Sequence, residues 1–229
     1  MCGRFALKAS IDYIEERFTA QAMFSNIDFA PSFNIAPSQT CPVIVASEKG
    51  RQIKLMKWGL IPSWSKEPKA NYSTINARVE GIETKPAFRK PFRTQHCLIP
   101  ANGFFEWKKP ELVKAPKIPY FIYLQGNEAP LFAMAGLYDI WRDEHGQELY
   151  SFTIITTEAN ELIKPLHNRM AVILPEEFES IWLDTTNTNP AKVLSILKPF
   201  PPKLMVAHLV SNQVNSPYNN TPELIEPLH

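Results

Sequence analysis

Short apolar runs recur along most of this chain and are separated by turn-forming residues, a pattern typical of β-strands. We predict strands, in chain order, over residues 3–7, 42–47, 52–60, 97–100, 103–108, 120–124, 131–138, 150–156, 171–174 and 203–209. The second and third strands flank Glu48, Lys49 and Gly50, so they are predicted to form a hairpin. The lysine- and proline-rich stretch 108–119 is predicted to be the loop of another hairpin.

Three stretches instead place apolar residues on one face of a helix. The first is predicted over 11–18, where Ser10 can cap the helix N-terminus. The second begins at Pro175, and the third begins at Asn189 and ends before Pro199. Their apolar faces consist of Ile11, Ile14 and Phe18, of Phe178, Ile181 and Trp182, and of Val193, Leu194 and Leu197.

The predicted strands outnumber the helices and do not alternate with them, so the fold class is α+β. We expect a single domain over residues 2–227, with a mixed, barrel-like β-sheet and a few peripheral helices. Residues 25–40 and 61–75 carry turn chemistry without a period and are predicted to be long irregular segments. Loops of that length inside a compact domain are often functional.

Composition narrows the function classes. With 45% hydrophobic and 21% charged residues, the chain is expected to be a folded globular protein. The net charge of +1 excludes a global basic field, so any nucleic-acid contact must come from a local patch. Three cysteines without a pairing rhythm and five scattered histidines favour a reducing compartment and no metal or cofactor. No apolar run reaches the ~18–20 residues of a membrane span, so we expect no membrane association and a cytoplasmic location.

Cys2 carries the most specific chemistry. Removal of Met1 would leave a free α-amine beside the Cys2 thiol, and such a 1,2-aminothiol traps aldehydes. The amine condenses to a Schiff base, and the thiolate then closes a five-membered thiazolidine ring. We expect both groups to react near neutral pH, because an α-amine titrates near ~7.7–8.0 and a free thiol near ~8.5.

Glu106 and His167 are the candidate acid–base groups. Glu106 interrupts an aromatic strand, sharing one face with Phe104 and Lys108, and neighbouring aromatics would raise its pKa by desolvation. The alternative is a glutamate on a solvated face, paired with Lys108. His167 lies in a polar stretch before an apolar strand, where functional residues often gather. The alternative for His167 is an ordinary structural histidine.

The candidate phosphate ligands are three arginines, each beside another candidate: Arg4, Arg78 and Arg169. The guanidinium fork binds phosphate oxygens in a bidentate way, and the alternative is three ordinary surface salt bridges. Trp58 and Trp64 flank a short segment that contains a glycine and a proline. We expect Trp58 to lie in the core and Trp64 to be exposed, where its ring can stack on a base.

Seven stretches together carry a resemblance to a known family. They are Met1–Phe5, Phe33–Gln39, Lys57–Pro62, Asn76–Glu80, Cys97–Trp107, His167–Met170 and Val210–Asn215. In this order they resemble the SOS-response-associated peptidase (SRAP) family of abasic-site processing proteins, over residues 2 to about 227. An ordered set of motifs is much more specific than any one of them.

The resemblance implies a monomeric protein that binds single-stranded DNA and crosslinks covalently to an abasic site. By motif position, Cys2 is the nucleophile, Asn76 orients its α-amine, and Glu106 and His167 are the acid–base pair. His167 would assist opening of the sugar by proton transfer.

By the same resemblance Arg4 and Arg78 hold phosphates beside the lesion, and we expect both to line one opening with the catalytic residues. Trp64 stacks on DNA, although Ser65 stands where some members have a second tryptophan.

Three other functions are compatible with the same residues. Cys2 with His167 and Glu106 also resembles a cysteine-hydrolase arrangement, which predicts a peptidase or limited self-processing that removes Met1. A Schiff base at C1 of the sugar acidifies the C2 protons, which predicts weak abasic-site lyase activity. A non-covalent single-strand-binding module would use the arginines and Trp64 without needing Cys2.

Overall fold

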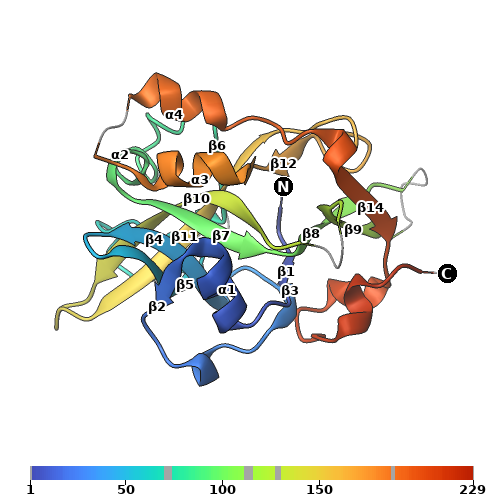
Figure 1. Ribbon diagram of the computed structural model, residues 1–229, viewed down its shortest axis with the longest axis horizontal. Helices are drawn as coiled ribbons and strands as arrows, with labels where there is room; N and C mark the ends of the chain where they lie inside the picture. The colour runs from blue at the N-terminus through green and yellow to red at the C-terminus, as the bar shows by residue number, and fades with distance from the viewer. Residues whose placement is uncertain (1, 70–73, 111–115, 127–129, 187–188, 229) are drawn as a thin grey trace.

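A closed β-barrel forms the core of the computed structural model, which describes residues 2–69, 74–110, 116–126, 130–186 and 189–228 (Figure 1). Its strands pair in the cyclic order β4, β5, β11, β10 and β7, and all neighbours are antiparallel except β5 and β11. The strands span Thr40–Ser47 (β4), Gly50–Trp58 (β5), His96–Ala101 (β7), Phe132–Arg142 (β10) and Glu148–Glu158 (β11). The prediction of an α+β fold with a mixed, barrel-like sheet is confirmed.

Close packing of the barrel strands requires a glycine at position 136. A Cβ atom on Gly136 would lie 2.2 Å from Ile99 Cδ1 and 2.7 Å from the carbonyl oxygen of Thr153. Any larger side chain would therefore push β10 away from β7 or β11.

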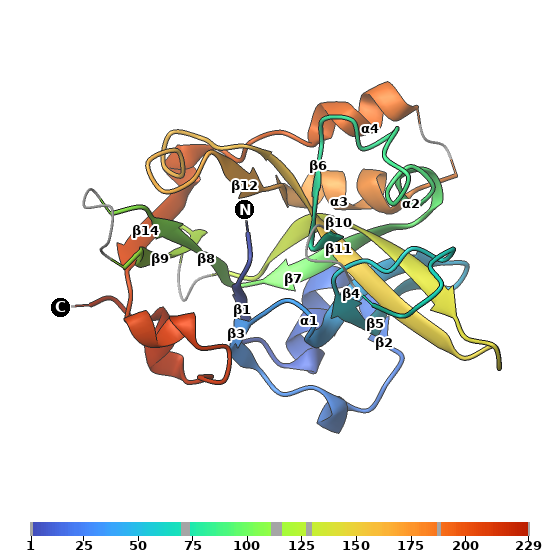
Figure 2. The same cartoon turned by 180° about the vertical axis from the view of Figure 1, so that it is seen from behind.

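A second sheet lies beside the barrel and carries the amino-terminal strand (Figures 1 and 2). Its strand order is β14-β9-β8-β1-β3. The strands span Phe5–Leu7 (β1), Ser32–Ile35 (β3), Gly103–Lys108 (β8), Ile118–Leu124 (β9) and Met205–Leu209 (β14). Strand β8 follows β7 after Asn102, so the chain passes directly from the barrel into this sheet. The predicted alternation along β8 is confirmed, because Phe104 packs in the barrel core and Phe105 in a separate smaller cluster.

Two short strands flank the carboxyl-terminal half of β11. Strand β6 (Asn76–Arg78) runs parallel to it, with Asn76 opposite Ile154, and β12 (Arg169–Ala171) runs antiparallel, with Arg169 opposite Glu158. Two further short strands, β2 (Ala20–Ala22) and β13 (Ile173–Leu174), pair with β5 and β10.

The helices lie outside the barrel (Figures 1 and 2). They are α1 (Ile11–Phe18), α2 (Pro91–Thr94), α3 (Glu176–Leu183) and α4 (Pro190–Ile196). Helices α1, α3 and α4 are where the sequence predicts them, and α2 was not predicted. The Ser10 cap is confirmed by the bond from the Tyr13 N–H to Ser10 Oγ. Pro175 precedes α3 as its cap residue.

Several boundaries differ from the predictions. Residues 25–40 are not wholly irregular, because Ser32–Ile35 form β3 by pairing with β1. Strand β2 was not predicted, and the first strand begins at Phe5 rather than at residue 3. The predicted strand 171–174 is divided between β12 and β13. Parts of two predicted loops, 70–73 and 111–115, and Met1 itself lie outside the described residues. Over the described ranges, no helix is long and apolar enough to cross a membrane.

Candidate active site and nucleic-acid interface

The four predicted catalytic residues come from four different parts of the chain. Cys2 precedes β1, Asn76 begins β6, Glu106 lies within β8, and His167 precedes β12. In both orientations of the molecule the amino-terminal end of the chain lies near β8 and β12 (Figures 1 and 2).

Cys2 and Asn76 are in direct contact. The Asn76 side-chain N–H donates to the carbonyl oxygen of Cys2 at 2.9 Å. The other end of the same amide, Asn76 Oδ1, is buried and has no hydrogen-bond partner within the described part of the chain. A buried polar atom without a partner is costly, so this oxygen is an acceptor held ready beside residue 2.

The Cys2 thiol is fully buried, and its Sγ lies 3.9 Å from the carbonyl oxygen of Arg4. Burial and, to a smaller extent, the negative charge of Glu106 raise the pKa of Cys2 to about 12. The expectation of a thiol that titrates near ~8.5 is therefore wrong for the described chain, because the sequence does not reveal this burial. A thiol in this environment needs a base before it can react.

Glu106 is buried on the barrel side of β8, with 3% of its surface exposed. This position contradicts the alternative of a solvated glutamate. Burial raises the pKa of Glu106, and the positive charges of the amino terminus and of Lys117 partly offset that effect. The predicted direction of the shift is confirmed. A raised pKa keeps a proton on the carboxyl group to higher pH than in a free glutamate, which suits a group that gives and takes protons during catalysis.

His167 has a defined tautomer. Its Nδ1 accepts a hydrogen bond from the backbone N–H of Arg169 at 3.0 Å, so a neutral ring carries its proton on Nε2. Burial lowers the pKa of His167, and so do the positive charges of the amino terminus, Lys109 and Lys117. The ring is therefore neutral at pH 7 and presents an Nε2–H donor.

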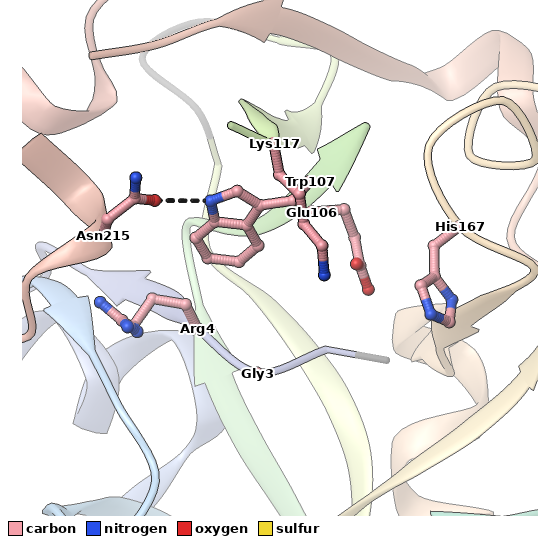
Figure 3. Close-up of a pocket in the computed structure, with 7 residues that line it drawn as sticks. All are labelled: Gly3, Arg4, Glu106, Trp107, Lys117, His167 and Asn215. Atoms are coloured by element: carbon pink, nitrogen blue, oxygen red, sulfur yellow. Dashed lines mark hydrogen bonds between the residues drawn. The ribbon is translucent and has the colours of Figure 1, made fainter. Parts of the chain in front are cut away.

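A cleft of about 550 Å³ contains two of the four predicted catalytic residues, Glu106 and His167 (Figure 3). It is lined by Gly3, Arg4, Glu106, Trp107, Lys117, His167 and Asn215. In Figure 3 the Glu106 carboxylate and the His167 ring lie on one side of the cleft, Arg4 lies toward Asn215 on the other, and Gly3 lies between them. We call this opening the first cleft.

Arg4 is fixed in the first cleft by buried neighbours. Its Nη1 donates to Asn34 Oδ1 and to the carbonyl oxygen of Val214, both at 2.7 Å, and its guanidinium lies 5.9 Å from the centre of the Trp107 ring. The Trp107 ring is itself held by a bond from Nε1 to Asn215 Oδ1 at 2.7 Å.

A second cleft, of about 520 Å³, opens on the other side of Asn76. It is lined by Trp64, Thr74, Asn76, Arg78, Lys85, Pro86, Ala87 and Phe88. Trp64 is 67% exposed and Trp58 is fully buried, which confirms both predictions. Arg78 is exposed, but it does not line the same opening as Arg4 as predicted. The two arginines line separate clefts. Gly3, next to Cys2, lines the first cleft and Asn76 lines the second, so the contact between Cys2 and Asn76 lies between residues of the two clefts.

The Arg169 side chain is held by hydrogen bonds within the protein, whereas Arg78 is exposed. Its Nη1 and Nη2 form a two-pronged pair with Glu80 at 2.7 and 2.8 Å, and Nη2 also donates to the carbonyl oxygen of Thr156 at 2.6 Å. Its side chain is 11% exposed. The fork expected to bind phosphate is thus occupied by the protein's own groups.

Sequence reasoning did not single out several residues that line the clefts. Lys117 lies in a loop whose lysines look like ordinary surface charges, and Lys85 and Phe88 lie in a stretch without a period. Asn34 belongs to one of the seven stretches, so its membership of a motif was the only available signal.

Comparison with known proteins gives a consistent result. A family model described as SOS response associated peptidase (SRAP) matches residues 1–217. The chain is 45% identical to the abasic site processing protein YoqW of Bacillus subtilis (strain 168), over 99% of each chain. It is 33% identical to the abasic site processing protein HMCES of Xenopus tropicalis, over 85% of this chain and 65% of that protein. A crystal structure of a Bacteroides thetaiotaomicron protein superposes with a TM-score of 0.88 at 31% identity and covers all of both chains.

Proposed function

This chain belongs to the SOS response associated peptidase (SRAP) family, and from that premise we propose that it processes abasic sites in DNA by capturing the lesion's aldehyde on Cys2. The observation that carries the proposal is the contact between Asn76, which lines the second cleft, and Cys2, whose neighbour Gly3 lines the first. Several curated relatives are named abasic site processing proteins.

The proposed reaction begins with the amine. Once Met1 is removed, the α-amine of Cys2 can donate to the buried Asn76 Oδ1, which would point its lone pair at the sugar. The amine adds to the C1 aldehyde to give a carbinolamine. Glu106 protonates the hydroxyl group, which leaves as water, and an iminium ion forms while Glu106 remains as a carboxylate.

The thiol acts second. Because the pKa of Cys2 is raised to about 12, the thiol is not the first nucleophile at neutral pH. Glu106, which has just given up its proton, accepts the thiol proton as sulfur adds to the iminium carbon. The electron pair of the C–N double bond moves onto nitrogen, which keeps its one proton as a neutral secondary amine, and the product is a thiazolidine. One water is lost overall.

His167 acts on the sugar before the amine attacks. An abasic sugar is mostly a closed hemiacetal, and its ring oxygen gains negative charge as the ring opens. The Nε2–H of neutral His167 would stabilise that charge by a hydrogen bond. This tautomer favours a hydrogen-bond donor rather than the proton-transfer role implied by the resemblance.

The two clefts suggest the course of a single strand. We propose that the strand passes from one cleft to the other over Cys2, with phosphates near Arg78 on one side and Arg4 on the other. An abasic site in a single strand has no base to unstack or unpair, so it reaches Cys2 without the free-energy cost of flipping a base out of a duplex. All of these groups come from one chain, so we propose that the protein acts as a monomer.

Arg169 takes a supporting role in this proposal. Its backbone N–H fixes the His167 ring, and its side chain is anchored to Glu80. The anchor would keep His167 in place when DNA binds.

General cysteine peptidase activity is less well supported. A cysteine peptidase relies on a thiolate paired with an imidazolium ion, whereas burial raises the pKa of Cys2 and lowers that of His167. Removal of Met1 by the protein itself and weak abasic-site lyase activity through the imine remain parts of the proposal.

A denaturing gel of protein mixed with abasic single-stranded DNA tests the proposal. Wild-type protein should give a heat-stable crosslink. Cys2→Ser keeps the amine but has a poor second nucleophile, so its adduct should survive heating only after borohydride reduction. Cys41→Ser is the matched control, since Cys41 is also a buried free thiol, and it should crosslink like wild type. Equal heat-stable crosslinking by Cys2→Ser without borohydride would refute the role of Cys2.

A further inference from the structure

The turn that carries Trp64 is anchored on both sides by side chains of strand β10. Asp139 Oδ2 accepts a hydrogen bond from the Ser63 N–H at 2.8 Å, and Trp141 Nε1 donates to the carbonyl oxygen of Ser65 at 2.8 Å. The turn itself is closed by a bond from the Ser65 N–H to the carbonyl oxygen of Pro62 at 2.9 Å. The residues on either side of Trp64 are therefore fixed by separate side chains.

Both anchors lie on one face of β10, because residues two positions apart on a strand point to the same side. Asp139 is 2% exposed, and its other oxygen accepts from the Ile140 N–H at 2.9 Å. This buried carboxylate thus bonds main-chain N–H groups. Lys90 Nζ lies 3.3 Å from Ser63 Oγ and 3.9 Å from Asp139 Oδ1, which places a positive charge beside it.

The preceding residues are also tied to the barrel. The Gly59 N–H donates to the carbonyl oxygen of Phe152 at 2.9 Å, and the Ile61 N–H donates to Ser151 Oγ at 2.8 Å. The segment from Gly59 to Ser65 is thereby fixed to β10 and β11 along its length.

The one large side chain of this turn points away from the protein. Trp64 is 67% exposed and borders the second cleft, where Arg78 and Lys85 offer positive charge for phosphates. An aromatic ring whose backbone is already fixed loses little conformational entropy when a partner stacks on it. Aromatic rings beside a positively charged groove suit unpaired nucleobases.

We propose that Asp139 and Trp141 are positioning residues, which hold Trp64 as a rigid platform for a nucleobase that flanks the lesion. The inference rests on the proposed function for the identity of the strand. The resemblance already implies that Trp64 stacks on DNA, and the inference adds the two residues that hold its backbone in place.

Binding to a tetrahydrofuran analogue of the abasic site tests the proposal, because the analogue has no aldehyde and binds without reacting. Two oligonucleotides are compared by fluorescence anisotropy, one with a base on each side of the analogue and one with further analogues at those positions. Trp64→Ala should weaken binding of the first roughly fivefold to 150-fold, the range for one stacked base, and leave the second nearly unchanged.

Trp141→Phe keeps an aromatic ring on β10 but removes the N–H that holds Ser65. As a single substitution it should weaken binding of the base-flanked strand by about threefold to tenfold. Added to Trp64→Ala it should cause no further loss, because the effects of coupled residues are not additive. Asp139→Asn tests the other anchor in the same way. Tyr150→Phe, on the adjacent strand, is the control and should bind like wild type.

The proposal is overturned if both anchor variants bind the base-flanked strand like wild type, or if they weaken binding equally when Trp64 is absent. It is also overturned if wild type has no preference for the base-flanked strand. Because the analogue cannot crosslink, a failure of the Cys2 chemistry would leave these results unchanged, so the two proposals fail separately.

Discussion

Glu106 and Asn76 are polar side chains that the fold buries where hydrophobic residues would be more stabilising. Glu106 keeps a carboxyl group 3% exposed, and Asn76 keeps an amide oxygen without a partner among the residues that the structure describes. Both features lower stability, and both are explained if the groups act on a substrate at residue 2.

Glu106→Gln should therefore stabilise the protein at neutral pH. Because burial raises the pKa of Glu106, the folded protein holds this proton more tightly than the unfolded chain does. The wild type thus loses stability as pH rises above the ordinary glutamate pKa of ~4.3 and through the raised one. We expect Glu106→Gln to be more stable by about 1–2 kcal/mol at pH 7, with the difference vanishing near pH 4.

Urea unfolding of both proteins across this pH range measures the difference. Crosslinking by Glu106→Gln should be slower by roughly 10²–10⁴-fold, the usual range for loss of an acid–base group. A stability difference that did not change with pH would mean that the carboxyl group is not the source.

At the scale of elements, the segment around η4 (Asn212–Asn215) closes the first cleft although it lies near the end of the chain. Asn34 on β3 holds it, since its Nδ2 donates to the carbonyl oxygens of Val214, Ser216 and Asn219 at 3.4, 3.0 and 2.8 Å. The same side chain accepts from Arg4. One buried amide thus joins β1, β3 and this segment.

Asn34→Asp should destabilise the protein by about 1–3 kcal/mol, because it keeps the acceptor for Arg4 but leaves the carbonyl oxygens without their donor. Asn212→Asp makes the same chemical change at an exposed position and should alter stability by less than about 0.5 kcal/mol. Thermal unfolding of both variants measures the contrast. Equal losses would show that the network around Asn34 contributes no stability of its own.

The sequence predicts the long strands and three helices because these segments carry their own period and caps. It does not predict β3 or β6, which are short and become strands by pairing with β1 and β11. The site also combines residues that the local sequence reveals with contacts that only the fold creates. Cys2, Glu106 and His167 stand out by residue type and motif, but the arrangement around Arg4 depends on partners 30 and 210 positions away. Burial of the Cys2 thiol also depends on such distant contacts.

At the scale of the whole molecule, a chain with a net charge of +1 presents separate positive groups in two clefts. Electrostatic attraction to DNA is then local, and each exposed arginine contributes separately. Arg78 is exposed, whereas Arg169 is paired with Glu80. Substituting each arginine in turn therefore compares the contribution of an exposed and of a paired guanidinium to DNA binding.

Arg78→Ala should weaken binding to any single strand and reduce the slope of log K against log salt by about 0.7, the value for one phosphate. The loss should be nearly the same for all sequences. Arg169→Ala should leave the slope unchanged, because its fork is occupied by Glu80. A loss that depended on sequence would indicate that Arg78 contacts bases, and a reduced slope for Arg169→Ala would show that Arg169 binds phosphate after all.

The central claim is that the N-terminal aminothiol of Cys2 forms the bond to the lesion. Mass spectrometry of the purified crosslink, before and after borohydride treatment, tests it most directly. The account predicts a mass equal to the protein without Met1 plus the DNA minus one water, unchanged by borohydride, with the DNA attached to the peptide Cys2–Arg4. A crosslink that retains Met1, or one attached to a lysine such as Lys117, would contradict it.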